Sequence, residues 1–143
     1  MVRRKKIRII LDTNWYISAT INRKSRRRLY NFLTDQSISI LYSEKLVEEY
    51  NDVMSREKYV RIILPHQTAR FAALVISKLQ EINVRSSIVM SRDPKDNFLL
   101  ALSKDGKANY LVTGDEDLLV LNKIGGTRII KMSEFEKILY SEP

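Results

Sequence analysis

Short apolar runs alternate along the chain with longer stretches in which apolar residues lie three or four positions apart. Nearly continuous apolar runs at 7–11, 38–42, 110–112 and 128–130 predict buried strands, because strands covered on both faces lose the alternation of polar and apolar residues. A weaker run at 88–90 indicates one more strand, the third in chain order. The pattern therefore predicts about five short strands separated by helical segments.

Helical spacing of apolar residues fills the segments between these strands. The predicted helices are a short one capped by Thr13 or Asn14, then 26–35, 44–55, 57–63, 68–82, 95–104, 116–121 and a closing helix from 133. Ser25, Ser43 and Thr68 are expected as N-caps. Ser133 and Glu136 have the spacing of a capping box. Strands that alternate with helices favour an α/β fold with three layers, α/β/α, around a central parallel sheet, as a single domain over 1–143.

The composition is typical of a folded protein and removes several classes of function. The 143 residues are 44% hydrophobic and include no cysteine, which excludes disulfides, thiol nucleophiles and cysteine zinc sites. No apolar stretch approaches the roughly 20 residues of a membrane helix, so we expect no membrane association. The basic start is followed by too short an apolar run for a signal peptide, and we expect a cytoplasmic protein.

The net positive charge of the chain favours a polyanionic partner. Lys and Arg number 25 against 17 Asp and Glu, which gives a formal net charge of +8. Such an excess favours nucleic acid first and anionic membrane second, although it can also serve solubility alone. The densest basic run consists of Arg23, Lys24, Arg26, Arg27 and Arg28. These side chains are candidates for binding RNA phosphates, and a solvated helix face is the alternative.

Two predicted strands end in aspartates. Asp12 follows the first strand directly, and Asp115 follows the 110–112 strand after Thr113 and Gly114. In an open parallel sheet the site lies outside the carboxyl ends of the strands, so these two carboxylates are expected at one edge. The alternative is that each aspartate only caps the helix that follows it.

Other acids are sorted by their neighbours on the predicted helices. Glu49 shares a face with Leu46 and Val53, whereas Glu48 lies among polar residues on the solvated face. An unpaired buried carboxylate is costly, so the position of Glu49 favours a functional role, unless its side chain extends to solvent.

Two further acids lie in the first turns of later helices. Asp96 has Leu99 and Leu100 below it on the same face, and Asp117 lies two residues after Asp115. Negative charges gathered at one crevice would destabilise the fold unless a cation joined them. Ligation by oxygen alone suits Mg²⁺ or Mn²⁺ rather than zinc, and the lone His66 reads as an ordinary helix-start residue. Metal-activated water attacking a phosphodiester fits both the acids and the positive charge.

Taken in order, these motifs resemble the PIN-domain family, and in particular its small bacterial and archaeal members that act as toxins of toxin–antitoxin pairs. The resemblance runs from about 7 to 140 and is carried by Leu11-Asp12-Thr13-Asn14, by Ser43, Glu49 and Val53-Met54-Ser55-Arg56, by Arg92-Asp93-Pro94-Lys95-Asp96-Asn97, and by the stretch from Tyr110 to Leu119. It implies a Rossmann-like sheet of order 3-2-1-4-5. It also implies a metal-dependent endoribonuclease that forms homodimers and is silenced by an antitoxin.

The resemblance also implies roles for individual residues. The matching positions are an acidic quartet of Asp12, Glu49, Asp96 and Asp115, a fifth acid at Asp117, and polar residues at Thr113 and Asn14 that orient the acids or a water. Asn97 departs from the pattern, because many relatives carry another acid there. Two alternatives remain: a non-catalytic PIN-like module that binds RNA or protein, and an RNA-processing nuclease that is not a toxin. A nucleotide-binding Rossmann protein is disfavoured, because the chain lacks a Gly-rich phosphate loop.

Overall fold

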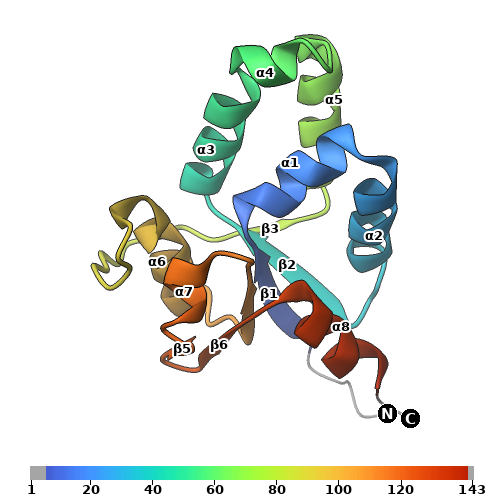
Figure 1. The fold of residues 1–143 in the computed structure, drawn as a ribbon. Helices are drawn as coiled ribbons and strands as arrows, with labels where there is room; N and C mark the ends of the chain where they lie inside the picture. Colours follow the sequence, from blue (N-terminus) through green and yellow to red (C-terminus); the bar gives the residue numbers. More distant parts are fainter. Residues whose placement is uncertain (1–5, 142–143) are drawn as a thin grey trace.

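The central feature of the structure, a computed structural model that describes residues 6–141, is a six-stranded sheet. The strands are β1 (Ile7–Leu11), β2 (Ile38–Tyr42), β3 (Gln80–Glu81), β4 (Tyr110–Val112), β5 (Lys123–Ile124) and β6 (Thr127–Ile130). Their order is β3-β2-β1-β4-β6-β5, and every pair is parallel except the β5–β6 hairpin. The predicted order 3-2-1-4-5 is therefore confirmed, with β6 in the fifth place and a two-residue strand added at the edge (Figure 1).

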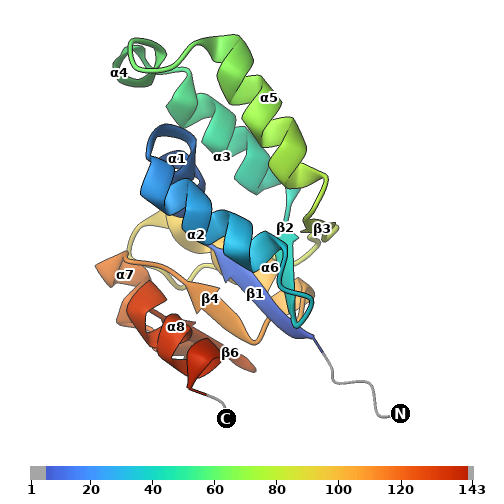
Figure 2. The same cartoon turned by 90° about the vertical axis from the view of Figure 1, so that its right-hand side faces the viewer.

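Helices cover both faces of this sheet, as the α/β/α prediction requires. They are α1 (Thr13–Ile21), α2 (Arg23–Leu33), α3 (Glu44–Met54), α4 (Glu57–Val60), α5 (Pro65–Ile76), the 3-10 helix η1 (Pro94–Asp96), α6 (Asn97–Asp105), α7 (Glu116–Leu119) and α8 (Met132–Tyr140). Figure 2 shows α1, α2 and α8 in front of the sheet and α6 behind it. The α2 and α8 helices meet through Phe32 and Phe135, whose rings pack edge to face with centroids 5.7 Å apart.

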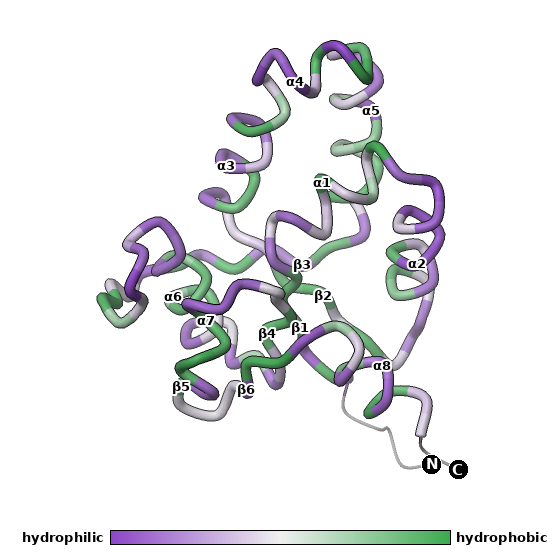
Figure 3. Tube along the Cα trace, viewed as in Figure 1, coloured by the Kyte–Doolittle hydropathy of each residue, from purple (hydrophilic) through white to green (hydrophobic). Residues whose placement is uncertain are grey.

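The core lies where the central strands are covered from both sides. Ile9, Ile10 and Leu11 of β1 are fully buried, as are Leu111 and Val112 of β4. Figure 3 shows the hydrophobic colour concentrated on the central strands and the hydrophilic colour at the start of α2. Burial of the strands on both faces explains why their sequence contains apolar runs rather than alternation.

The third strand was predicted in the wrong place. Residues 88–90 form no strand, and the side chains of Val89 and Met90 are exposed. The sheet instead takes Gln80 and Glu81 beside β2, and the amide of Ile82 continues the pairing by donating to the Tyr42 carbonyl at 2.9 Å. An edge strand with exposed side chains is held by its backbone, so it leaves no hydrophobic pattern in the sequence. The helix predicted over 68–82 accordingly ends at Ile76.

Helix starts were predicted with mixed success. Ser43 caps α3 as predicted, accepting a hydrogen bond from the Leu46 amide at 3.3 Å. Asn22, rather than Ser25, caps α2, because its side chain accepts from the Ser25 amide at 3.1 Å. The α5 helix begins at Pro65 instead of being capped by Thr68. Proline suits the first helical position, where its missing N–H would have no partner.

The capping box predicted at the last helix is wrong. The α8 helix begins at Met132, and Lys131 occupies its N-cap position without a side-chain hydrogen bond. Glu136 forms an ion pair with Arg28 of α2 instead. Its carboxylate thus joins two helices on the same face of the sheet rather than the end of its own helix. No helix within residues 6–141 is both long and apolar enough to span a membrane.

Candidate functional site

The site begins where the adjacent parallel strands β1 and β4 end. Leu11 pairs with Val112 in register, so the next residues, Asp12 and Thr113, leave the sheet side by side. The Thr113 hydroxyl, fully buried, donates to Asp12 Oδ2 at 2.5 Å and accepts from the Asp115 amide at 3.0 Å. One threonine therefore contacts the carboxylate of one strand end and the backbone of the other.

Both aspartates also cap the helices that follow them. Asp12 Oδ1 accepts from the Asn14 amide at 3.2 Å, and Asp115 Oδ1 accepts from the Asp117 amide at 2.9 Å. The capping interpretation of the sequence is thus correct as local structure. It does not exclude a role in a site, because each carboxylate has further lone pairs to offer.

Asp96 brings a third carboxyl group to this edge from the end of η1. Its Oδ2 atom is buried and has no hydrogen-bond partner among the described residues. Burial, followed by the nearby carboxyl groups of Asp115, Asp93 and Asp12, raises the pKa of Asp96 to about 8. The pKa of Asp12 is also raised, mainly by burial, although hydrogen bonds from Thr113 and Asn14 oppose the shift. Asp12, Asp96 and Asp115 therefore act on one another electrostatically at one place.

Glu49 reaches the site through a residue that the sequence analysis did not single out. The hydroxyl of Thr13, the residue after Asp12, donates a hydrogen bond to Glu49 Oε2. Glu49 is half-buried on α3, and Glu48 is exposed, as the helix faces predicted. A small hydroxyl residue beside a candidate aspartate is the signal that could have indicated Thr13, because such residues commonly orient carboxylates.

Asp117 and Asn14 lie at the rim. Asp117, in the first turn of α7, has Oδ1 at 3.9 Å from Arg92 Nη1. The Asn14 side chain is exposed, and the contact that it makes with the acids is through its backbone amide. A role of the Asn14 side chain in orienting a water stays a prediction.

The donor set has the chemistry of a hard divalent cation. In the part of the chain that the structure describes, the carboxylates of Asp12, Asp96 and Asp115 form no ion pair with a lysine or arginine, and Asp96 Oδ2 has no hydrogen-bond partner. Within residues 6–141 no group of three or more acidic or histidine side chains is placed so that it could already hold a metal ion. By their chemistry these oxygen donors would suit Mg²⁺ or Mn²⁺, and a bound cation would compete with the proton that burial favours on Asp96.

Two residues of the basic run bind within the protein. Arg26 donates through Nε to the Ala19 carbonyl at 3.0 Å and through Nη2 to the Thr20 carbonyl at 2.8 Å. Its guanidinium also lies 5.9 Å from the centre of the Phe71 ring. Arg28 is held by Glu136, as described above. Because free carbonyls at a helix end attract cations, Arg26 serves the last turn of α1. Arg23, Lys24 and Arg27 remain exposed and stay candidates for binding RNA.

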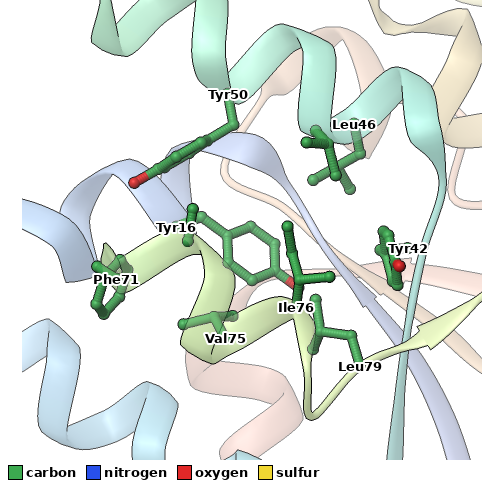
Figure 4. Close-up of a pocket in the computed structure, with 10 residues that line it drawn as sticks. Tyr16, Tyr42, Leu46, Tyr50, Phe71, Val75, Ile76 and Leu79 are labelled. Carbon is green, nitrogen blue, oxygen red and sulfur yellow. The ribbon is translucent and has the colours of Figure 1, made fainter. Parts of the chain in front are cut away.

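An apolar cavity of about 30 Å³ lies apart from the acids, between α1, α3 and α5. Figure 4 shows the Tyr16 ring in the middle of its lining, with Leu46, Val75 and Ile76 around it. The Tyr16 hydroxyl is buried without a hydrogen-bond partner among the described residues, and burial raises its pKa. No carboxylate lines the cavity, so it is separate from the acidic site.

The fold and the site together define an α/β protein with carboxylates gathered at the carboxyl edge of a parallel sheet. Residues 8–117 match the family model of the PIN domain. The chain therefore belongs to the PIN domain family. PIN domains are generally nucleases, which places the chain in a family of hydrolases.

Individual relatives agree with this placement. An uncharacterized protein of Methanocaldococcus jannaschii, MJ1680, is 25% identical over 125 residues, covering 81% of this chain and 76% of the relative. The crystal structure of PAE2754 from Pyrobaculum aerophilum is similar with a TM-score of 0.64 at 14% identity, covering 96% of this chain and 91% of that one. The crystal structure of VapBC2 from Rickettsia felis, bound to a DNA fragment from their promoter, is similar with a TM-score of 0.57 at 15% identity. It covers 86% of this chain and 97% of that one. At these identities the two structures support the fold.

Proposed function

We propose that the protein is a Mg²⁺- or Mn²⁺-dependent endoribonuclease that hydrolyses phosphodiester bonds of RNA. The observation that carries the proposal is the meeting of Asp12 and Asp115 through Thr113, with the unpaired buried oxygen of Asp96 beside them. Family membership supports the nuclease class. The net charge of +8 supports a polyanionic substrate.

Each residue of the site has a proposed task. Asp12, Asp96 and Asp115 would hold the cation, which supplies an activated water and neutralises charge on the phosphate. Thr113 would fix the orientation of Asp12 by donating to its Oδ2 atom, which leaves further lone pairs of the carboxylate for the cation. Glu49, held by Thr13, and Asp117 would support a second ion or orient the attacking water.

The RNA strand would be bound mainly through its phosphates. Arg23, Lys24 and Arg27 are exposed at the start of α2 and can contact the backbone without reading sequence. We further propose that the protein acts in the cytoplasm as a homodimer and is the toxin of a toxin–antitoxin pair, bound by an antitoxin protein. The similarity to the VapBC2 structure supports this role. Growth arrest on expression that Asp12→Asn relieves would distinguish a toxin from an RNA-processing nuclease.

Cleavage by purified protein tests the proposed chemistry. A fluorescent single-stranded RNA is incubated with Mn²⁺ and wild type, Asp12→Asn or Asp96→Asn. Asp52→Asn is the matched control, because Asp52 is an exposed carboxylate of α3. We expect each site variant to lose about 100-fold or more in rate, since weakening even the groups behind metal ligands costs 10- to 100-fold. The control should cleave like wild type.

Equal cleavage by all four proteins would contradict the proposed site and indicate a contaminating nuclease. Calorimetric titration with Mn²⁺ adds a second readout that needs no substrate. If wild type neither cleaves RNA nor binds the metal in the millimolar range, a non-catalytic module that binds RNA or protein becomes the better description.

A further inference from the structure

Arg92 is a cation held at the rim of the acidic site. Its Nη1 atom lies 3.9 Å from Asp117 Oδ1. Among the ion pairs of the described residues, this is the one that involves a predicted site acid, since the others join Arg28, Lys45, Arg56, Arg61 and Arg128 to carboxylates elsewhere. Among residues 6–141, Arg92 is therefore the one arginine within ion-pair distance of a predicted site acid.

The backbone on both sides of Arg92 is fixed. The amide of Ser91, a buried residue, donates to Asn97 Oδ1 at 2.9 Å, and the Met90 amide donates to the same oxygen at 3.2 Å. On the other side, Asp93 caps η1 by accepting from the Lys95 amide at 3.0 Å. The position of the Arg92 Cα relative to η1, which carries Asp96, is thus set by these hydrogen bonds.

The Arg92 side chain itself is held only weakly. It is 88% exposed, and its contact with Asp117 is near the limit of an ion pair. An exposed pair of this length contributes little to stability, so it is weak enough to be exchanged for a better anion. The planar fork of a guanidinium can donate two hydrogen bonds to one phosphate, which a single distant carboxylate oxygen cannot match.

We propose that Arg92 binds a backbone phosphate of the RNA strand next to the scissile one, leaving Asp117 when the strand enters. This inference rests on the proposed ribonuclease function. Arg92 contacts Asp117 at the rim of the site rather than Asp12 or Asp96. The phosphate that it binds would therefore lie beside the reacting phosphate. Arg92 is therefore a substrate-binding residue whose loss affects the KM for RNA more than kcat.

RNA binding separates this role from catalysis. Fluorescence anisotropy of a labelled single-stranded oligoribonucleotide is measured with Mn²⁺ in the Asp12→Asn background, where cleavage is expected to be lost. Arg92→Ala and Arg92→Lys are compared with Arg70→Ala, which removes the same charge from an exposed position of α5. We expect Arg92→Ala to weaken binding about tenfold, as for a hydrogen bond to a charged group. Its log–log salt slope should fall by about 0.7, the value for one phosphate contact on a single strand.

Comparison of Arg92→Lys with Arg92→Ala shows what kind of contact is lost. Arg92→Lys should keep the salt slope but bind more weakly than the arginine, because it keeps the charge without the two-pronged geometry. In the cleavage assay, Arg92→Ala in the otherwise wild-type chain should raise KM with kcat retained.

The inference is overturned if Arg92→Ala and Arg70→Ala bind RNA equally and with the same salt slope, or if the parent protein binds no RNA. If wild type fails to cleave while binding still depends on Arg92, the ribonuclease proposal fails and the phosphate contact stands. The Arg92 and Arg70 variants should unfold at the same temperature as wild type, because both arginines are exposed.

Discussion

Replacing Asp96 by asparagine should remove a pH dependence from the stability of the metal-free protein. The pKa of Asp96 rises from 3.8 to about 8 because its carboxyl is buried beside Asp115, Asp93 and Asp12. At 1.36 kcal/mol for each pKa unit, the full difference would correspond to roughly 6 kcal/mol. The side chain is partly exposed, and solvent screening reduces the effect, so we expect about 1–3 kcal/mol.

The sign of this pH dependence follows from whether the folded or the unfolded chain binds the proton. Between pH 4 and pH 8 the folded protein keeps a proton on Asp96 that the unfolded chain has lost. Stability must therefore fall as pH rises through this window, and the stabilisation is fully present only below about pH 4. Binding of Mg²⁺ or Mn²⁺ displaces the proton, so the cation should bind more tightly as the pH approaches 8.

Urea unfolding in EDTA at pH 5, 6, 7 and 8 measures the effect. The free energy of unfolding of wild type and Asp52→Asn should fall from pH 5 to pH 8. That of Asp96→Asn should change less with pH. The difference between the slopes isolates Asp96 because the other titrating groups are shared. Parallel slopes for wild type and Asp96→Asn would refute the reasoning, since they would mean that Asp96 is ionised in the folded protein throughout.

Two further predictions concern packing and the basic run. Gly106→Ala should lower the free energy of unfolding by about 2 kcal/mol, because its Cβ would lie 2.8 Å from Leu41 Cδ1 and 2.9 Å from the Leu102 carbonyl oxygen. Gly126→Ala, with no atom within 4 Å, is the control in the same urea titration, and equal losses would contradict the clash. Arg26→Ala should cost about 1 kcal/mol of stability, since it removes two hydrogen bonds to α1 carbonyls. Arg27→Ala should instead weaken RNA binding and leave the melting temperature unchanged; the opposite result would show that Arg26 is the RNA contact.

The sequence reveals those parts of the fold that are buried on both faces. The strands β1, β4 and β6 were predicted because their apolar runs have no polar alternation, and the acids at the ends of β1 and β4 follow from them. The edge strand at Gln80 and Glu81 could not be predicted, because it is held by backbone pairing with β2 and buries little. The run at 88–90 was predicted as a strand because it is hydrophobic, but only Ile88 packs against the core, whereas Val89 and Met90 are exposed.

The candidate site also has features that the sequence contains and features that only the folded chain reveals. Asp12, Glu49, Asp96, Asp115 and Asp117 were proposed from their local positions, which the sequence contains. The contacts that orient them join distant parts of the chain: Thr113 lies 101 positions after Asp12, and Thr13 lies 36 positions before Glu49. Arg26 illustrates the opposite case. Its basic neighbours indicated a free cationic face, whereas its guanidinium reaches the last turn of α1. Only the packed structure decides which charges remain available.

The long sequence separation between Asp12 and Thr113 also determines when, during synthesis of the chain, the site can form. Asp12 is made early in synthesis, but the hydroxyl that fixes it comes 101 residues later. The Thr113 amide in turn donates to the Ile130 carbonyl on β6 at 2.9 Å, so the strand beside β4 arrives later still. A chain on the ribosome that has not reached Ile130 lacks the bond between β4 and β6, so the end of β4 that carries Thr113 is not yet held as in the complete fold. If the proposed nuclease activity depends on this centre, it can arise only after residue 130 has been synthesised.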